Sequence, residues 1–381
     1  MNDPAIQSDA RPLPTNDLAT AYQPRRVLAS AFSLIWNVLV ILLFIALRGP
    51  HRLEGFASHH KAIQSSGEFL FSAAAFATIC FIGHAIVNYP VELWFGYLQE
   101  RQFGLAKDGI RAWTLDWLHG VLQHGMQFIA GATLILVLQH FYPIYWMIYL
   151  AGAWLVLFLA SSYMAYAMLP RGLFHFESPD ETLRARLQSL VQFSLPKIVI
   201  FSSPSMRDFT GGMIGLGNLK RLLISRSTAA AASDNLLRFV LLHEQGHLKY
   251  HHTLLSTLAG WAWVALGMII TDFGILHFKP GIDGHLAYLI WMALGISIWM
   301  AVGEPMLAYL GRRLEYQADR FFLRNGGNTE SLQSALEELS NRNHARSEKL
   351  RRRDTLLHPL PSIWNRVHAA KIFESSNLGR K

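Results

Sequence analysis

The chain has 381 residues, of which 51% are hydrophobic and only 16% are charged. This balance, with a mean hydropathy of +0.22, excludes a disordered chain and favours a multi-pass membrane protein with a modest soluble part. The single cysteine excludes a fold that depends on internal disulfides, and the net charge of +8 suits contact with anionic lipid headgroups.

The N-terminal part predicts a short tail followed by a membrane region. Residues 1–29 begin with a stretch rich in Asn, Asp, Pro, Ala and Gln, which is typical of a disordered tail. Residues 30–170 contain four apolar stretches close to the length of about 20 residues that a helix needs to cross a bilayer. They are Ala31–Leu47, Phe69–Tyr89, Leu118–Leu138 and Pro143–Met168. A buried core helix is the alternative for the second stretch, and an interfacial helix is the alternative for the third.

Residues 171–381 predict a peptidase domain that begins with a small soluble region. Lys197–Phe201 and Leu222–Ser225 read as strands, and the Gly-rich segment Gly211–Gly217 joins them. An exposed strand edge beside a metal-binding helix can pair with an extended substrate backbone. A small sheet that only packs under the helix is the alternative.

The sequence His-Glu-Gln-Gly-His at residues 243–247 predicts a catalytic metal site on a helix. Residues four apart share a helical face, so His243 and His247 can offer ring nitrogens to one ion. Glu244 can then take a proton from the water that the ion holds. Ser233 or Asp234 is the expected N-cap of this helix. Two solvated histidines on an amphipathic helix are the alternative interpretation.

Two more apolar stretches follow, Leu254–Ile270 and Leu286–Gly303, separated by Thr271–His285. Each is close to the span length of about 20 residues. A two-helix excursion across the membrane would return Glu315 to the side from which His247 departed. The sequence therefore predicts six spans in total.

Glu315 is the candidate for the third protein ligand that an open zinc site needs. Asp319 lies four residues further on the same helical face, where it can accept the far N–H of a zinc-bound histidine and fix its tautomer. Taken alone, these two carboxylates beside Arg312 and Arg313 would describe a solvated, salt-bridged helix face.

The basic residues predict the orientation in the membrane. If the N-terminus lies inside, all but four of the 34 Lys and Arg residues fall on inside segments. The four outside are Arg48, Arg52, Lys61 and Lys279. The positive-inside rule then places both termini and the metal site in the cytoplasm. Nucleic-acid binding is not expected, although Lys349–Arg353 is a basic run.

Taken together, these motifs resemble those of the integral-membrane zinc metallopeptidases typified by the type 1 CAAX prenyl protease. The resemblance extends from the second span to Ala369, and its motifs are His243–His247, Glu315–Asp319, Leu357-His358-Pro359 with Arg366, and Glu100-Arg101-Gln102-Phe103-Gly104. It implies a mainly α fold, a polytopic membrane helical bundle with a small α+β zincin-like catalytic subdomain. It also implies that His358 steadies the oxyanion and that Arg366 holds local structure or joins that network. Where relatives carry an Asn-Ala-aromatic strand, this chain has Gly211-Gly212-Met213.

The expected function is a zinc-dependent endopeptidase with one zinc ion. We expect it to hydrolyse peptide or protein substrates at the cytoplasmic side of a bacterial inner membrane. One alternative is a quality-control protease of the same family that degrades misfolded membrane proteins. An alternative of another class is a transporter or scaffold with a structural or vestigial metal site. A structural zinc is normally closed by four Cys or His ligands, which the single cysteine disfavours.

Overall fold

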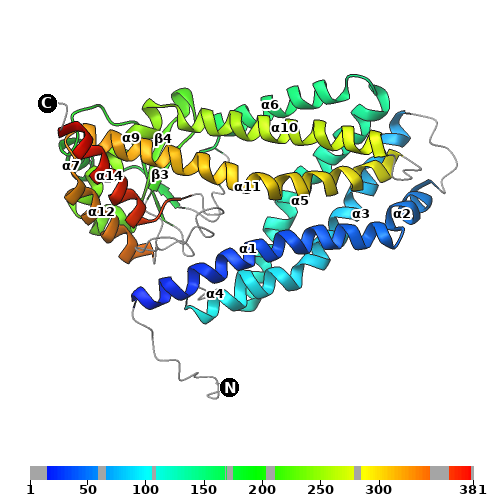
Figure 1. Ribbon diagram of the computed structural model, residues 1–381, viewed down its shortest axis with the longest axis horizontal. Coiled ribbons are helices and arrows are strands. Elements are labelled where there is room, and N and C mark those ends of the chain that lie inside the picture. Colours follow the sequence, from blue (N-terminus) through cyan, green and yellow to red (C-terminus); the bar gives the residue numbers. More distant parts are fainter. Residues whose placement is uncertain are drawn as a thin grey trace, which may run out of the picture.

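The computed structural model describes residues 15–58, 66–104, 109–167, 169, 175–202, 211–278, 285–343 and 360–378. Long helices run along the longest axis, and a small sheet with shorter helices forms one end of the molecule (Figure 1). This is the predicted mainly α fold with a small α+β subdomain.

The N-terminal helices are α1 (Thr15–Ala46), α2 (Gly49–Ser58), α3 (Ser66–Glu92), α4 (Gln99–Gln102), α5 (Ile110–Phe141) and α6 (Trp146–Tyr163). A π-helical turn, Leu93–Leu98, joins α3 to α4. The later helices are α7 (Glu181–Ser189), α8 (Arg226–Ala231), α9 (Asp234–Lys249), α10 (His252–Phe278), α11 (His285–Arg324), α12 (Thr329–Asn343) and α14 (Ile363–Leu378).

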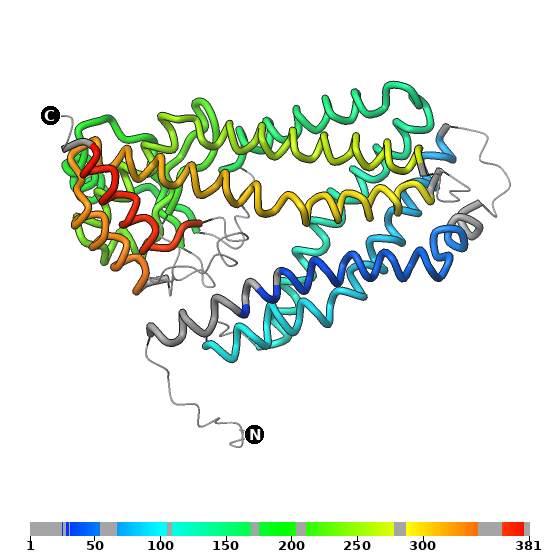
Figure 2. Tube along the Cα trace, viewed as in Figure 1, coloured from blue at the N-terminus to red at the C-terminus, as the bar shows by residue number. Residues whose placement is uncertain are grey.

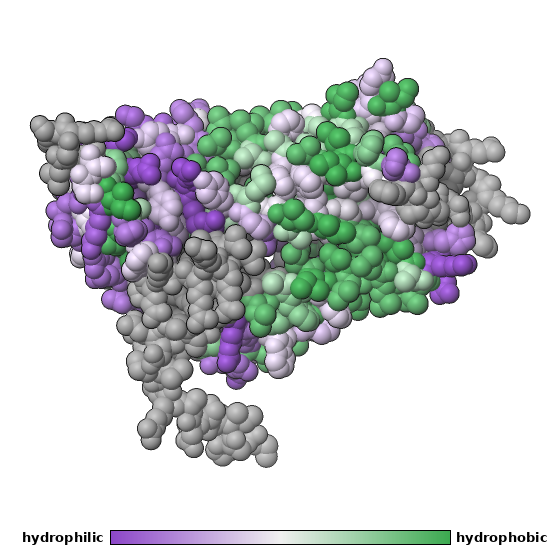
Figure 3. Space-filling view, viewed as in Figure 1, coloured by the Kyte–Doolittle hydropathy of each residue, from purple (hydrophilic) through white to green (hydrophobic). Residues whose placement is uncertain are grey.

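Five helices in the described ranges are long and apolar enough to cross a membrane. They cover Gly67–Gln102, Ile110–Phe141, Trp146–Tyr163, His252–His277 and Ala287–Arg324. The apolar part of α1, Ala31–Ala46, is shorter than these five and lies where the first of the six spans was predicted. At most 39% of the apolar window of any span is buried, and an apolar surface covers the long helices in Figure 3. Such exposed apolar surface suits contact with lipid.

Three boundaries differ from the predictions. Helix α1 begins at Thr15, so it extends into the predicted disordered tail, and residues 1–14 lie outside the described ranges. Helix α10 continues to Phe278, past the predicted end of its span at Ile270. Helix α11 has 40 residues and passes through Pro305 without a break, so one helix contains both the last span and Glu315. Apolar length alone does not mark these ends, because helices extend beyond the hydrocarbon core into the interface.

Helix α11 connects the membrane region to the sheet. Figure 2 shows it, yellow to orange, running from the far end of the bundle into the end that contains the sheet. Its path returns the chain to α9 after the excursion through α10, as the sequence predicts. Glu315 therefore comes close to His247 although the two are far apart in sequence.

A four-stranded sheet has the order β1-β2-β4-β3. Its strands are β1 (His175–Glu177), β2 (Ile198–Ser202), β3 (Gly211–Ile214) and β4 (Arg221–Ser225). Strands β2 and β4 are the two predicted strands, and they pair in parallel. Strand β3 lies within the predicted Gly-rich connection and pairs antiparallel with β4, with Met213 opposite Leu222. Strand propensity alone did not indicate this edge strand, because glycine weakens it, and only the family resemblance pointed to a strand at Gly211-Gly212-Met213.

The core of the soluble end fixes the position of α9. Leu236, Leu237, Val240 and Leu241 are buried on one face of α9, against β2, β4 and α12. Burial of each such side chain contributes about 1.5–3 kcal/mol, so this face strongly determines the rotation of the helix. Gly246 lets α11 approach closely, because a Cβ there would lie 3.0 Å from Phe321 Cβ and 3.1 Å from Ala318 Cα. The two helices that carry the candidate ligands are thus in direct contact.

Candidate metal centre

Helix α9 begins with a double cap that fixes its N-terminus. The hydroxyl of Ser233 accepts a hydrogen bond from the Leu236 N–H at 3.1 Å, so Ser233 is the N-cap. Glu338 on α12 accepts from both the backbone N–H and the hydroxyl of Ser233, at 3.1 and 2.5 Å. These bonds and the buried apolar face hold His243 and His247 on the last two turns of the helix.

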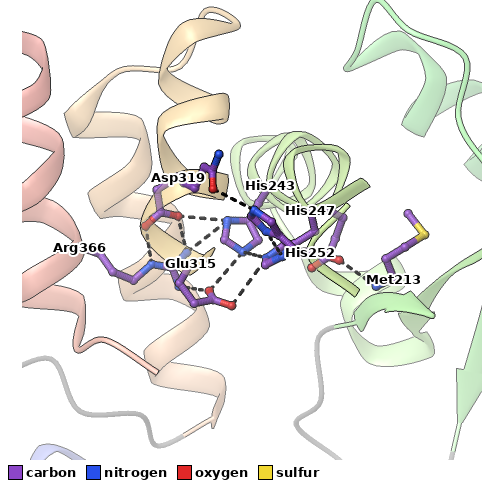
Figure 4. Close-up of polar contacts among 9 residues, drawn as sticks. Met213, His243, His247, His252, Glu315, Asp319 and Arg366 are labelled. Atoms are coloured by element: carbon purple, nitrogen blue, oxygen red, sulfur yellow. Dashed lines mark hydrogen bonds and ion pairs between the residues drawn. The ribbon is translucent and has the colours of Figure 1, made fainter. Parts of the chain in front are cut away.

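Three candidate ligand groups converge between α9 and α11 (Figure 4). His243 Nε2 lies 3.1 Å from His247 Nε2 and 3.3 Å from Glu315 Oε2, and His247 Nε2 lies 3.6 Å from Glu315 Oε1. A tetrahedral ion with ligand distances of about 2.0–2.2 Å places its ligand atoms about 3.3–3.6 Å apart. The side chains are therefore spaced as ligands of one ion.

The charges around these atoms favour a cation. Two imidazole nitrogens and a carboxylate face one another, and they repel unless positive charge lies between them. Burial lowers the pKa of His243, but hydrogen bonds to Asp319 and Glu315 and the charge of Glu315 outweigh it and raise that pKa to about 9. Burial and the charge of His243 lower the pKa of His247 to about 4. The His243 ring thus attracts a second proton. A divalent cation bound by all three groups would supply this positive charge in place of the proton.

Glu244 lies on the side of the histidines that faces β3. The ring nitrogens of His243 and His247 and a carboxylate oxygen of Glu244 lie within 4.8 Å of one another. Its Oε2 accepts a hydrogen bond from the backbone N–H of Met213 at 2.8 Å. Burial raises the pKa of Glu244, while the charge of His243 and this hydrogen bond oppose the rise. The carboxylate is thus held between the edge strand and the histidines, where a base is needed.

Asp319 and Arg366 form a paired network behind His243. Asp319 Oδ1 lies 3.1 Å from His243 Nδ1, so the ring presents Nε2 to the centre. Arg366, on α14, donates to both Asp319 oxygens, from Nε at 2.8 Å and from the second amino group at 2.5 Å. Asp319 raises the pKa of Arg366 against the lowering effect of burial. A bidentate pair of this kind fixes the orientation of the carboxylate.

The structure brings together six of the seven residues that the sequence singled out. They are His243, Glu244, His247, Glu315, Asp319 and Arg366. His358 lies outside the described residues. Two further groups contact these residues, the Met213 N–H beside Glu244 and the buried imidazole of His252 beside His247. A backbone N–H leaves no sequence signal, and the position of His252 five residues after His247 does not by itself indicate a contact between the two rings.

Comparisons with known proteins identify the family of the chain. The sequence matches the family model of peptidase family M48 over residues 180–373, and the model "CAAX prenyl protease N-terminal, five membrane helices" over residues 7–170. It is 24% identical over 324 residues to a CAAX prenyl protease 1 homolog of Oryza sativa subsp. japonica, covering 80% of this chain and 74% of that protein. It is 24% identical over 155 residues to a Protease HtpX homolog of Methylibium petroleiphilum, covering 40% of this chain and 53% of that protein.

A solved structure shares the whole architecture. The crystal structure of S. mikatae Ste24p superposes with a TM-score of 0.74, covering 95% of this chain and 92% of that one at 17% sequence identity. The fold and the family matches together define a multi-pass membrane protein of the metalloprotease class. The chain belongs to peptidase family M48. The resemblance to the CAAX prenyl proteases that the motifs indicated is thereby confirmed.

Proposed function

We propose that this protease is a zinc-dependent endopeptidase with one ion, held by His243, His247 and Glu315. The convergence of these three side chains, with ring nitrogens and carboxylate oxygens 3.1–3.6 Å apart, is the observation that carries this proposal. Two imidazole nitrogens and one carboxylate oxygen are a donor set that zinc prefers in catalytic sites. When bound, zinc supplies a lowered pKa for a water molecule and polarisation of a carbonyl oxygen.

The side chains of this chain supply the proton transfers. Glu244 takes a proton from the attacking water and returns it to the leaving amine when the peptide bond breaks. Asp319 accepts a hydrogen bond from the Nδ1–H of His243, which leaves Nε2 of the ring unprotonated for the ion. The bidentate contact with Arg366 keeps Asp319 ionised and in place. By the family resemblance, His358 steadies the developing oxyanion.

The edge of the sheet is the proposed substrate platform. Strand β3 is at the edge, and its Met213 N–H already points to Glu244. An extended peptide that pairs with β3 would bring a carbonyl group next to the histidines. Gly211 and Gly212 offer no side chains for contact, so we expect this strand to select substrates mainly through backbone hydrogen bonds.

We further propose that the active site lies on the cytoplasmic side of a bacterial inner membrane, as the distribution of Lys and Arg supports. Residues 171–381 would form the peptidase domain, with two of its own spans, and residues 30–170 the N-terminal membrane region. Two substrate classes are proposed. The first is CAAX-like C-terminal processing, supported by the match to a CAAX prenyl protease 1 homolog, and the second is degradation of misfolded membrane proteins, supported by the Gly-Gly strand, which offers no side chains for sequence selection.

Chelation of the metal should abolish proteolysis. The protein, purified in detergent, is incubated with a peptide library before and after treatment with a zinc chelator. We expect cleavage in the untreated sample, loss of cleavage with the chelator, and recovery after zinc is added back, because Glu244 alone cannot activate water sufficiently. Cleavage confined to C-terminal tripeptides supports processing, and dispersed cleavage supports degradation. Activity that persists in metal-free protein would refute the zinc mechanism.

A further inference from the structure

A buried histidine outside the predicted ligand set contacts one of the ligands. His252 is the first residue of α10 and is only 3% exposed. Its Nδ1 lies 2.9 Å from His247 Nδ1, and its Nε2 lies 3.2 Å from Oε1 of Gln317 on α11 (Figure 4). From the sequence, His251 and His252 are interpreted as a snorkelling pair at the membrane interface, with a second metal site as the alternative. The structure separates the two, because His251 is exposed and His252 is buried.

The hydrogen atoms of this chain of contacts can be assigned from donor and acceptor chemistry. Gln317 Oε1 only accepts, so His252 donates from Nε2–H. The other nitrogen of a neutral His252, Nδ1, then carries a lone pair and accepts from the Nδ1–H of His247. His247 is left with an unprotonated Nε2, the atom that faces His243 and Glu315. Both hydrogen bonds of His252 are thus satisfied, and His247 is in the tautomer that a metal ligand needs.

The backbone builds this contact through a tight corner between α9 and α10. His251 adopts a left-handed conformation with φ of 55°, and its N–H donates to the carbonyl of Leu248 at 3.1 Å. The corner turns the chain so that His252 lies over the edge of the His247 ring, with ring centroids 4.8 Å apart. The Tyr250 ring stacks with the His252 ring, with centroids 5.8 Å apart, which further restricts the imidazole.

Helix α11 supports His243 and His247 through different hydrogen-bond acceptors. Asp319, a carboxylate paired with Arg366, accepts from His243. Gln317, a neutral amide, ends the chain that begins at His247. Both lie within four residues of Glu315, so one turn of α11 supplies a ligand and the support for two others.

We propose that His252, oriented by Gln317, is a positioning residue that fixes the tautomer and direction of His247 through a neutral hydrogen-bond relay. This inference rests on the proposed function, since it gives the relay its purpose at a zinc site. His252 contacts neither the centre nor the proposed substrate strand directly. Removal of such a partner of a metal-bound histidine typically lowers metal affinity about 10–100-fold.

The test measures zinc affinity directly, by competition with a chromophoric chelator, on the full-length protein in detergent. His252→Leu should lower zinc affinity about 10–100-fold. His252→Asn should stay close to wild type, because its side-chain oxygen can accept from the Nδ1–H of His247. The zinc affinity of Gln317→Leu should fall between those of His252→Asn and His252→Leu. The double variant with His252→Leu and Gln317→Leu should bind zinc no more weakly than His252→Leu alone, because both substitutions break the same relay. The exposed neighbour gives the matched control, His251→Asn, in which Asn tolerates the left-handed backbone.

A second readout separates positioning from general damage. In cobalt-substituted protein, His252→Leu should change the visible absorption spectrum, and at saturating zinc it should lower kcat with little change in KM. Wild-type zinc affinity and an unchanged cobalt spectrum in folded His252→Leu protein would overturn the relay. If His252→Leu does not fold, either of two results would overturn the relay. One is a loss of expression in His252→Asn as large as that in His252→Leu, and the other is wild-type zinc affinity in Gln317→Leu. A wild-type protein that binds no zinc would instead refute the proposed function.

Discussion

Replacement of Glu244 by Gln is expected to abolish peptide cleavage while the metal content of the protein stays close to that of the wild type. Glu244 is outside the proposed ligand set of His243, His247 and Glu315, so the ion should still bind. Gln is nearly isosteric, and its side-chain oxygen can still accept the 2.8 Å hydrogen bond from the Met213 N–H. It cannot accept a proton from water, however, and loss of a general base typically costs about 10²–10⁴-fold in rate.

Paired measurements of kcat and of zinc per protein check this prediction. Gln245→Ala, at the next position of the same helix, serves as the control and should retain activity. If Glu244→Gln cleaves peptides as fast as the wild type, Glu244 takes no part in proton transfer. If zinc is lost together with activity, Glu244 holds the ion, and the assignment of Glu315 as the third ligand needs revision.

The second large effect is expected from Glu315→Ala, which should deplete the protein of zinc. Its carboxylate oxygens lie 3.3 and 3.6 Å from the two ring nitrogens, whereas Asp319, the next carboxylate on α11, contacts Nδ1 of His243 and is paired with Arg366. Removal of a ligand should weaken binding by more than the roughly 10–100-fold loss seen for outer hydrogen-bond partners. Activity should fall with the zinc content and should recover only partly at high zinc concentration.

A matched control for this variant lies on the same helix. Glu304 is exposed, and a straight helix places it about 16 Å from Glu315, too far to reach the same ion. Glu304→Ala should therefore keep full zinc content, as measured by inductively coupled plasma mass spectrometry after dialysis. A fully loaded Glu315→Ala protein would show that the third ligand lies elsewhere in the chain.

Much of this arrangement could be predicted because its signals are local or periodic. The i, i+4 spacing of His243 and His247 encodes a shared helical face, and apolar length encodes the spans. The convergence with Glu315 followed from topology, since two successive spans return the chain to the same side. These signals can be read from the sequence without any knowledge of tertiary contacts.

The features that residue patterns alone did not indicate depend largely on contacts between distant segments. Strand β3 forms because β4 supplies its hydrogen-bond partners, although Gly211 and Gly212 have low strand propensity. The role of His252 depends on Gln317, 65 residues further along the chain. The start of α1 at Thr15 was missed because a polar composition was taken as a sign of disorder.

The most direct test of the central claim is X-ray diffraction from crystals of the wild-type protein at energies on either side of the zinc absorption edge. We expect one strong anomalous peak that appears only above the edge. It should lie about 2.0–2.2 Å from His243 Nε2, His247 Nε2 and a carboxylate oxygen of Glu315. A zinc peak bound by other residues, or a peak with Glu315 beyond bonding distance, would contradict the account.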